Sequence, residues 1–132
     1  MNEIDLSNLK LKTFTEQDAL DCCKINNINA DDIIQLNLNN NKLTDISGIR
    51  LFKNLKNLKY LHLYNNQIKN ISVIQNFKNL GVLEIVNLEL DSDQIKYIQS
   101  LKNLKELYCY KGFKDMSIIN KLNKNIEISY IN

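Results

Sequence analysis

The 132-residue sequence lacks proline and tryptophan, and it contains only three cysteines, three glycines and one histidine. Cys22 and Cys23 are adjacent and would close only a strained ring, so the sequence does not favour a disulfide framework and suits a reducing compartment. The glycines are isolated from one another, which argues against a glycine-rich phosphate-binding loop. We therefore predict a protein that binds no nucleotide cofactor.

The single histidine limits the chemistry that the side chains can support. His62 and a carboxylate on a neighbouring strand, Glu84, would supply two metal ligands, fewer than a zinc site uses. Cys109 falls at a core position between two tyrosines, which argues against a nucleophilic role. We expect no metal, no cofactor and no enzymatic activity.

Long apolar runs are also missing. The first ten residues, MNEIDLSNLK, are polar where a secretion signal needs roughly 7 to 15 apolar residues, and no segment approaches the roughly 18 residues of a membrane span. The 17 basic residues are interspersed with 15 acidic ones, so no polybasic stretch is available to neutralise phosphates. We predict a cytoplasmic protein that contacts neither membranes nor nucleic acid directly.

The sequence does contain a repeat, and its hydrophobic content of 44% is enough for one folded domain. The segments IIQLNLNNNKLTDI (Ile33–Ile46) and LKYLHLYNNQIKNI (Leu58–Ile71) both follow L-x-x-L-x-L-x-x-N-x-L-x-x-I, where L is any large aliphatic residue. Two further copies, from Leu80 and Leu104, replace the asparagine by Leu88 and Gly112. The repeat predicts strands that start at Leu36, Leu61, Leu83, Leu107 and Ile126.

This pattern resembles the leucine-rich-repeat family, in particular the class of about 22 residues seen in bacterial internalins and eukaryotic phosphatase regulators. The resemblance implies an α/β solenoid with short parallel strands on the concave face and 3₁₀ or irregular helical turns on the convex face. It also implies that the Asn41 and Asn66 side chains bond to the backbone of a neighbouring coil.

The residues before the first full repeat predict a terminal cap. Thr15 and Asp18 form a capping-box pattern, which predicts a short helix over 16–24. The segment LSNLKL (Leu6–Leu11) fits the start of the repeat and predicts a divergent first coil. We expect one domain over 1–132, with a cap over 1–32, repeats over 33–120 and a terminal coil over 121–132.

Alternation along each strand decides which residues face outward from the core. Four of the six tyrosines fall on outward positions, and two valines, Val82 and Val86, are predicted to extend an exposed apolar strip between Tyr64 and Tyr110. β-Propensity alone offers another explanation for tyrosine in strands. The predicted outward grid is Gln35, Asn37 and Asn39; Tyr60, His62 and Tyr64; Val82, Glu84 and Val86; Glu106, Tyr108 and Tyr110; and Asn125, Glu127 and Ser129.

Grouped outward tyrosines are typical of protein-binding surfaces. We predict a protein-interaction module whose partner carries basic and apolar groups, acting as a small inhibitor, such as an immunity protein or a phage-encoded blocker of a host defence enzyme of the CRISPR-nuclease kind. The alternative is a scaffold subunit of a larger assembly or of a homo-oligomer. The predicted partner-binding residues are Tyr60, His62, Tyr64, Val82, Glu84, Val86, Glu106, Tyr108, Tyr110 and Glu127.

Overall fold

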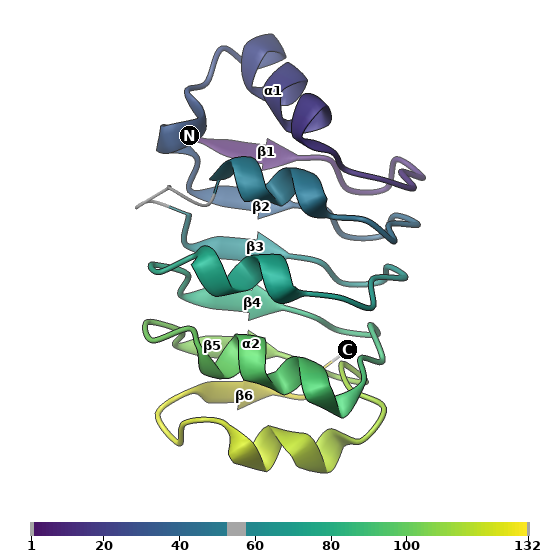
Figure 1. Cartoon of the computed structure of the whole chain (residues 1–132), viewed down its shortest axis with the longest axis vertical. Coiled ribbons are helices and arrows are strands. Elements are labelled where there is room, and N and C mark those ends of the chain that lie inside the picture. The colour runs from purple at the N-terminus through teal and green to yellow at the C-terminus, as the bar shows by residue number, and fades with distance from the viewer. Residues whose placement is uncertain (1, 53–57, 132) are drawn as a thin grey trace.

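The computed structural model describes residues 2–52 and 58–131 and contains a six-stranded parallel sheet whose spatial order follows the chain (Figure 1). Each strand belongs to one coil of a solenoid, and the coils stack along the long axis of the molecule. The predicted α/β solenoid is therefore confirmed. The strands are β1 (Glu3–Asp5), β2 (Gln35–Asn37), β3 (Tyr60–His62), β4 (Val82–Glu84), β5 (Glu106–Tyr108) and β6 (Glu127–Ser129).

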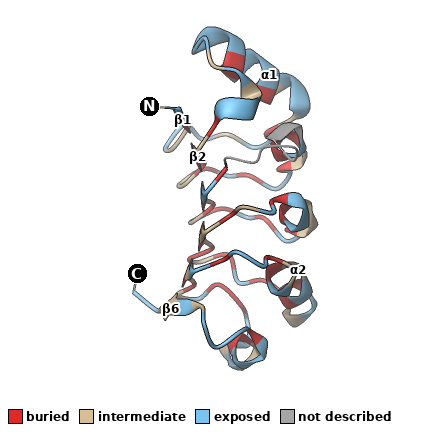
Figure 2. Cartoon of the chain, turned by 90° about the vertical axis from the view of Figure 1, so that its left-hand side faces the viewer, coloured by how far each residue is buried: buried red, intermediate tan, exposed pale blue. Residues whose placement is uncertain are grey.

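Short helical segments return the chain on the side opposite the sheet, and the buried residues lie between the two layers (Figure 2). The sheet bends so that its outward face is concave (Figure 2). The return helices that follow β2 to β5 are of the 3₁₀ type except for α2, as the family resemblance implied. They are η2 (Ser47–Phe52), η3 (Ser72–Asn76), η4 (Ser92–Gln94), the single α-helical turn α2 (Ile95–Gln99), and η5 (Met116–Lys121).

The core consists of aliphatic ladders that run through successive coils. Leu36, Leu61, Leu83 and Leu107 are paired in register across β2 to β5, and each is fully buried. The residues two positions later in each coil, Leu38, Leu63, Ile85 and Cys109, are also fully buried. A single continuous cluster therefore connects the coils.

Asparagine pairs close the turn after β2 and after β3. Asn40 and Asn65 adopt positive φ angles of 58° and 57°, a conformation that asparagine tolerates better than most residues. The following residues, Asn41 and Asn66, are 8% exposed and bond to backbone groups of their own and the preceding coil, as the family resemblance implied. In the next coil Asn87 keeps the positive φ, while Leu88 enters the core.

The residues before three return helices share a signal that the repeat pattern did not reveal. The Asp45, Asn70 and Asp115 side chains each accept a hydrogen bond from the backbone N–H of the serine two residues later, at 2.8, 2.8 and 3.0 Å. Such Asx turns satisfy amides that begin a helical turn. An Asp/Asn-x-Ser spacing therefore marks where η2, η3 and η5 begin.

The amino-terminal helix α1 spans Glu16–Ile25, one residue longer than predicted, and its Thr15–Asp18 capping box is formed. The expected first coil at Leu6–Leu11 was placed too late. Ile4 pairs with Leu36 in β1, whereas Leu9 is 54% exposed. The reason is that Asn41 binds the N–H groups of Leu9 and Leu11 at 3.0 Å each, which places both leucines in the turn.

Gly48 allows α1 to approach the second coil. Its N–H donates to the Phe14 carbonyl at 2.7 Å. A Cβ at this position would lie 2.1 Å from the Thr15 carbonyl oxygen, closer than any side chain can come. The absence of a side chain at residue 48 therefore lets the helix cap pack directly against η2.

The last strand was predicted two residues too early. Ile128, not Ile126, pairs with Leu107, and Glu127 pairs with Glu106. A shift of two residues preserves the inward and outward sets, so alternation alone cannot fix this register. Asn125 consequently lies before the strand, and the outward residues of the last coil begin at Glu127.

Candidate binding face

The outward residues of the sheet form columns across the strands. One column lies at the upstream ends of the strands and runs Glu3, Gln35, Tyr60, Val82, Glu106 and Glu127. The next runs Asp5, Asn37, His62, Glu84, Tyr108 and Ser129. Backbone hydrogen bonds beyond the strands continue the register, so that Asn39, Tyr64, Val86 and Tyr110 form a third column.

The structure brings the four predicted tyrosines to this face, but it corrects the expected apolar strip. Tyr60 is 39% exposed, whereas Tyr64, Tyr108 and Tyr110 are half-buried. Val86 is only 3% exposed and yet is not part of the core cluster. The strip between Tyr64 and Tyr110 is therefore not open to solvent at its middle.

The middle column contains a polar network, and the polar groups of this network form hydrogen bonds with other groups of the same chain. The Nδ1 atom of His62 lies 3.0 Å from Oε2 of Glu84, and Nδ2 of Asn39 donates to Oε1 of the same carboxylate at 3.0 Å. Asn39 also accepts from the Tyr64 N–H at 2.8 Å. Both carboxylate oxygens of Glu84 are therefore occupied within the chain, although this residue was among the predicted partner contacts.

This network changes the acidity of Glu84. The hydrogen bond from His62 lowers the pKa of the Glu84 carboxyl, with further lowering by the charge of His62 and by Asn39, against a raising effect of burial. Asp5 lies in the same column, and two hydrogen bonds from Ser7 lower its pKa as well. The face therefore remains anionic to lower pH than free carboxyl groups would allow.

The Glu84→Gln variant should lose part of the acid sensitivity of folding. Because the pKa of Glu84 is lower in the folded than in the unfolded chain, its carboxylate stabilises the fold above the ordinary value of 4.5, and this contribution disappears as the pH falls through the lowered pKa. Urea unfolding at about pH 7 and about pH 3 should show a smaller loss of stability in the variant than in wild type. An unchanged difference would contradict the proposed ionisation, and Glu89→Gln, an exposed position outside the sheet, serves as the control.

A hollow of about 640 Å³ opens at the upstream column, beside the ends of β3 to β6. Tyr60 and Val82 form its apolar wall, and Glu106 and Glu127 contribute carboxylates. Neither glutamate side chain forms a hydrogen bond or ion pair with any residue that the structure describes. This part of the face therefore carries two neighbouring carboxylates without a partner among the described residues.

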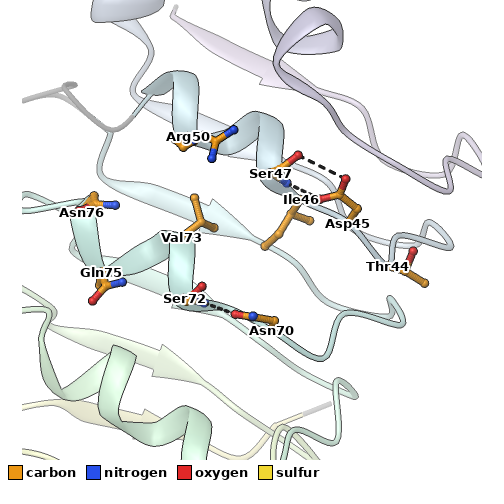
Figure 3. Close-up of a pocket in the computed structure, with 10 residues that line it drawn as sticks. All are labelled: Thr44, Asp45, Ile46, Ser47, Arg50, Asn70, Ser72, Val73, Gln75 and Asn76. Carbon is orange, nitrogen blue, oxygen red and sulfur yellow. Dashed lines mark hydrogen bonds between the residues drawn. The ribbon is translucent and has the colours of Figure 1, made fainter.

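A second hollow, of about 390 Å³, lies on the convex side between η2 and η3 (Figure 3). Asp45, Ser47, Asn70 and Ser72 line it, but these are the residues that cap the two helical turns, as the dashed bonds in Figure 3 show. Their polar groups are satisfied locally. We regard this hollow as the space between adjacent turns and not as a binding site.

The thiols lie apart from the sheet face. Cys109 is fully buried, and burial raises its pKa to about 11, so it is protonated at neutral pH and packs as an apolar residue. Burial also raises the pKa values of Cys22 and Cys23 in α1. Within residues 2–52 and 58–131, no group of three or more His, Cys, Asp or Glu residues could hold a metal ion, and no helix could cross a membrane.

Comparisons with known proteins agree with the solenoid geometry. The family model described as leucine-rich repeats (two copies) matches residues 33–76. Residues 33–76 of this chain are leucine-rich repeats. It is similar to internalin C2 from Listeria monocytogenes, with a TM-score of 0.69 and 21% identity over 97% of this chain and 50% of that one. A second internalin of that organism, InlF, gives a TM-score of 0.50 and 22% identity over 77% of this chain and 36% of that one.

The leucine-rich-repeat chain thus spans half or less of the length of these two internalins. At this level of identity the likeness establishes the fold. No curated protein matches the sequence. Leucine-rich-repeat domains generally mediate protein–protein interactions, and the outward face described above is consistent with a binding module.

Proposed function

We propose that the concave sheet face of this leucine-rich-repeat protein binds a partner protein. The observation that carries the proposal is the grouping of Tyr60, Tyr64, Tyr108 and Tyr110 on one face of a regular sheet. Tyrosine offers a large rigid surface with a polar end, which suits the centre of a protein interface. Lys111 holds its ammonium 5.4 Å from the Tyr110 ring, so this tyrosine is already positioned in the free chain.

The partner surface that fits this face is basic as well as apolar. The six strands carry five carboxylates, and they contain no lysine or arginine; the basic residues fall in the connections. Charge complementarity guides association and discriminates between partners. The carboxylates are Glu3, Asp5, Glu84, Glu106 and Glu127.

The finer proposal is that binding inhibits the partner in the cytoplasm. Inhibition needs only that the sheet cover a surface which the partner uses for another contact. Three free cysteines, two of them buried, suit a reducing compartment. An assay of the captured partner with and without the leucine-rich-repeat protein would test inhibition directly.

Tyr64→Ala combined with Tyr110→Ala should abolish or strongly weaken partner binding, while the fold persists. Each truncation removes a large contact surface that the core does not use, and hot-spot tyrosines each contribute about 1 kcal/mol or more. The measurement is affinity capture from a lysate of the source cell or its host, with mass spectrometry of proteins captured by wild type and by the double variant.

Tyr97→Ala is the matched control, because Tyr97 lies in α2 on the opposite side of the solenoid and is also half-buried. A partner that is lost with the double variant and retained with Tyr97→Ala supports the proposal. Retention by the double variant would move the interface away from the sheet.

A second candidate, self-assembly, rests on exposed apolar side chains at the two ends of the stack. Leu9 and Ile25 are 54% and 82% exposed near the first coil, and Tyr130 and Ile131 are 56% and 77% exposed after the last strand. Such residues suit contact with another copy or with further structure. Light scattering coupled to gel filtration separates the candidates, since a monomer at high concentration argues against assembly.

A further inference from the structure

The carboxylates of the sheet face are not equivalent, and this difference divides the face in two. Glu84 is held by His62 and Asn39, and Asp5 accepts two hydrogen bonds from Ser7. In contrast, the side chains of Glu106 and Glu127 make no hydrogen bond or ion pair with described residues, although the two residues are direct neighbours on β5 and β6. Glu3, at the opposite end of the upstream column, also lacks a side-chain partner among the described residues, but no second carboxylate adjoins it in that column. The paired anionic groups available to a partner therefore lie at the carboxyl-terminal end of the column.

Two like charges directly opposite each other on neighbouring strands destabilise a sheet. Lys59 and Lys105 line the same hollow, but both side chains are exposed and neither forms an ion pair with a described residue. Flexible lysine stems can turn to solvent. Glu106 and Glu127 are paired in register, so the rule for like charges predicts a repulsion between them that a cation bound between them would relieve.

The hollow beside this pair also has an apolar wall. Tyr60 and Val82 precede Glu106 and Glu127 in the same register column, and Tyr60 is the most exposed tyrosine of the sheet face. We call these four residues the upstream patch. A flat aromatic ring next to paired carboxylates fits a guanidinium, which binds carboxylates through its planar fork and stacks on aromatic faces.

We infer that the upstream patch receives an arginine side chain of the partner protein. This inference rests on the proposed function and specifies the partner's chemistry at one part of the face. The guanidinium lies between Glu106 and Glu127, and the aliphatic part of the side chain packs on Tyr60 and Val82. The tyrosines of the third column then contact apolar residues that flank this arginine in the partner.

The test uses a library of random peptides displayed on phage, selected against the immobilised full chain. Selected peptides should contain arginine flanked by apolar residues. Their binding, measured by fluorescence anisotropy, should weaken about tenfold or more in Glu106→Gln/Glu127→Gln and with peptides whose arginine is replaced by citrulline. Glu89→Gln/Asp93→Asn, which removes two exposed carboxylates outside the sheet, should bind as wild type does.

The outcomes separate this inference from the proposed function. Peptides that require Tyr64 and Tyr110 but bind equally well without the two glutamates, or without arginine, overturn the arginine assignment and leave the binding face intact. Peptides that bind all the variants alike contradict both. A selection that yields no peptide for the wild-type chain also counts against the inference.

A second measurement does not depend on any peptide. Glu127→Lys converts the like-charge pair into an opposite-charge pair, so it should raise the melting temperature by about 1 to 3 °C while it abolishes binding of the arginine peptides. A lower melting temperature would show that Glu106 and Glu127 do not repel each other, and it would remove the premise of the inference.

Discussion

Leu63→Asp should prevent the chain from folding into the complete solenoid at neutral pH. Leu63 is fully buried in the third coil, between the Leu38 and Ile85 ladder positions, which are also fully buried. Truncation of a buried leucine alone costs about 2 to 5 kcal/mol. The buried carboxylate adds several kcal/mol of desolvation, and the total approaches the whole stability of a typical domain.

Circular dichroism and urea unfolding test this expectation. Because each coil of a repeat protein contacts only its neighbours, a break in the middle of the stack separates the coils on either side. The cooperative transition should be lost or moved to very low urea. Tyr60→Asp is the control from the same coil, since Tyr60 faces outward and is 39% exposed, and it should fold normally. A wild-type transition for Leu63→Asp would show that the inward and outward assignments are wrong.

The sequence was sufficient to predict these assignments where the repeat is regular. Alternation fixed the inward residues of β2 to β5, and the asparagine spacing located Asn41 and Asn66. The register predicted from the sequence was wrong at both ends of the solenoid, for a physical reason. Near Ile4 the pattern competes with a second run of leucines, Leu6 to Leu11, and near Ile128 a slip of two residues preserves the same faces. The hydrogen bonds of Asn41 and the pairing of Glu127 settle the two registers.

The candidate face was predictable as a set of residues but not as a distribution of exposure and charge. Alternation shows that Val86 points away from the core, but it does not show that this side chain is only 3% exposed. Similarly, the sequence places His62 beside Glu84, whereas the second bond to this carboxylate comes from Asn39, 45 residues earlier in the chain. Such contacts depend on the length and direction of side chains that reach across two strands. The spacing of residues in the sequence does not predict either property.

The distribution of exposure and charge over the sheet face affects how the face would bind a partner. In the half of the sheet around β2 and β3, the amide side chains of Asn37 and Asn39 form hydrogen bonds within the chain. This half therefore offers a partner a surface of defined shape more than unpaired charge. The half around β5 and β6 offers two half-buried tyrosines, Tyr108 and Tyr110, and the free carboxylates of Glu106 and Glu127. Repulsion between like charges lowers stability in the free protein, which is a common property of surfaces kept for binding.

Asn66→Ala should lower the free energy of unfolding by about 2 to 4 kcal/mol, the second-largest effect that we expect. The Asn66 carboxamide accepts from the Leu43 N–H at 3.0 Å and donates to the carbonyls of Leu38 and Leu63 at 2.9 and 3.1 Å. Alanine leaves these backbone groups without their side-chain partner in a site that is 8% exposed, and each unsatisfied buried group costs about 1 to 3 kcal/mol.

Urea denaturation followed by circular dichroism gives the difference as a change in midpoint at constant slope. Asn76→Ala at the exposed end of η3 is the matched control and should remain within about 0.5 kcal/mol of wild type. Asn66→Leu is the informative companion, because Leu88 occupies the same repeat position in the next coil and is buried there. Leucine at residue 66 restores apolar volume but cannot accept the Leu43 N–H, so it should recover only part of the loss. Full recovery would mean that the position requires volume and not the hydrogen bonds.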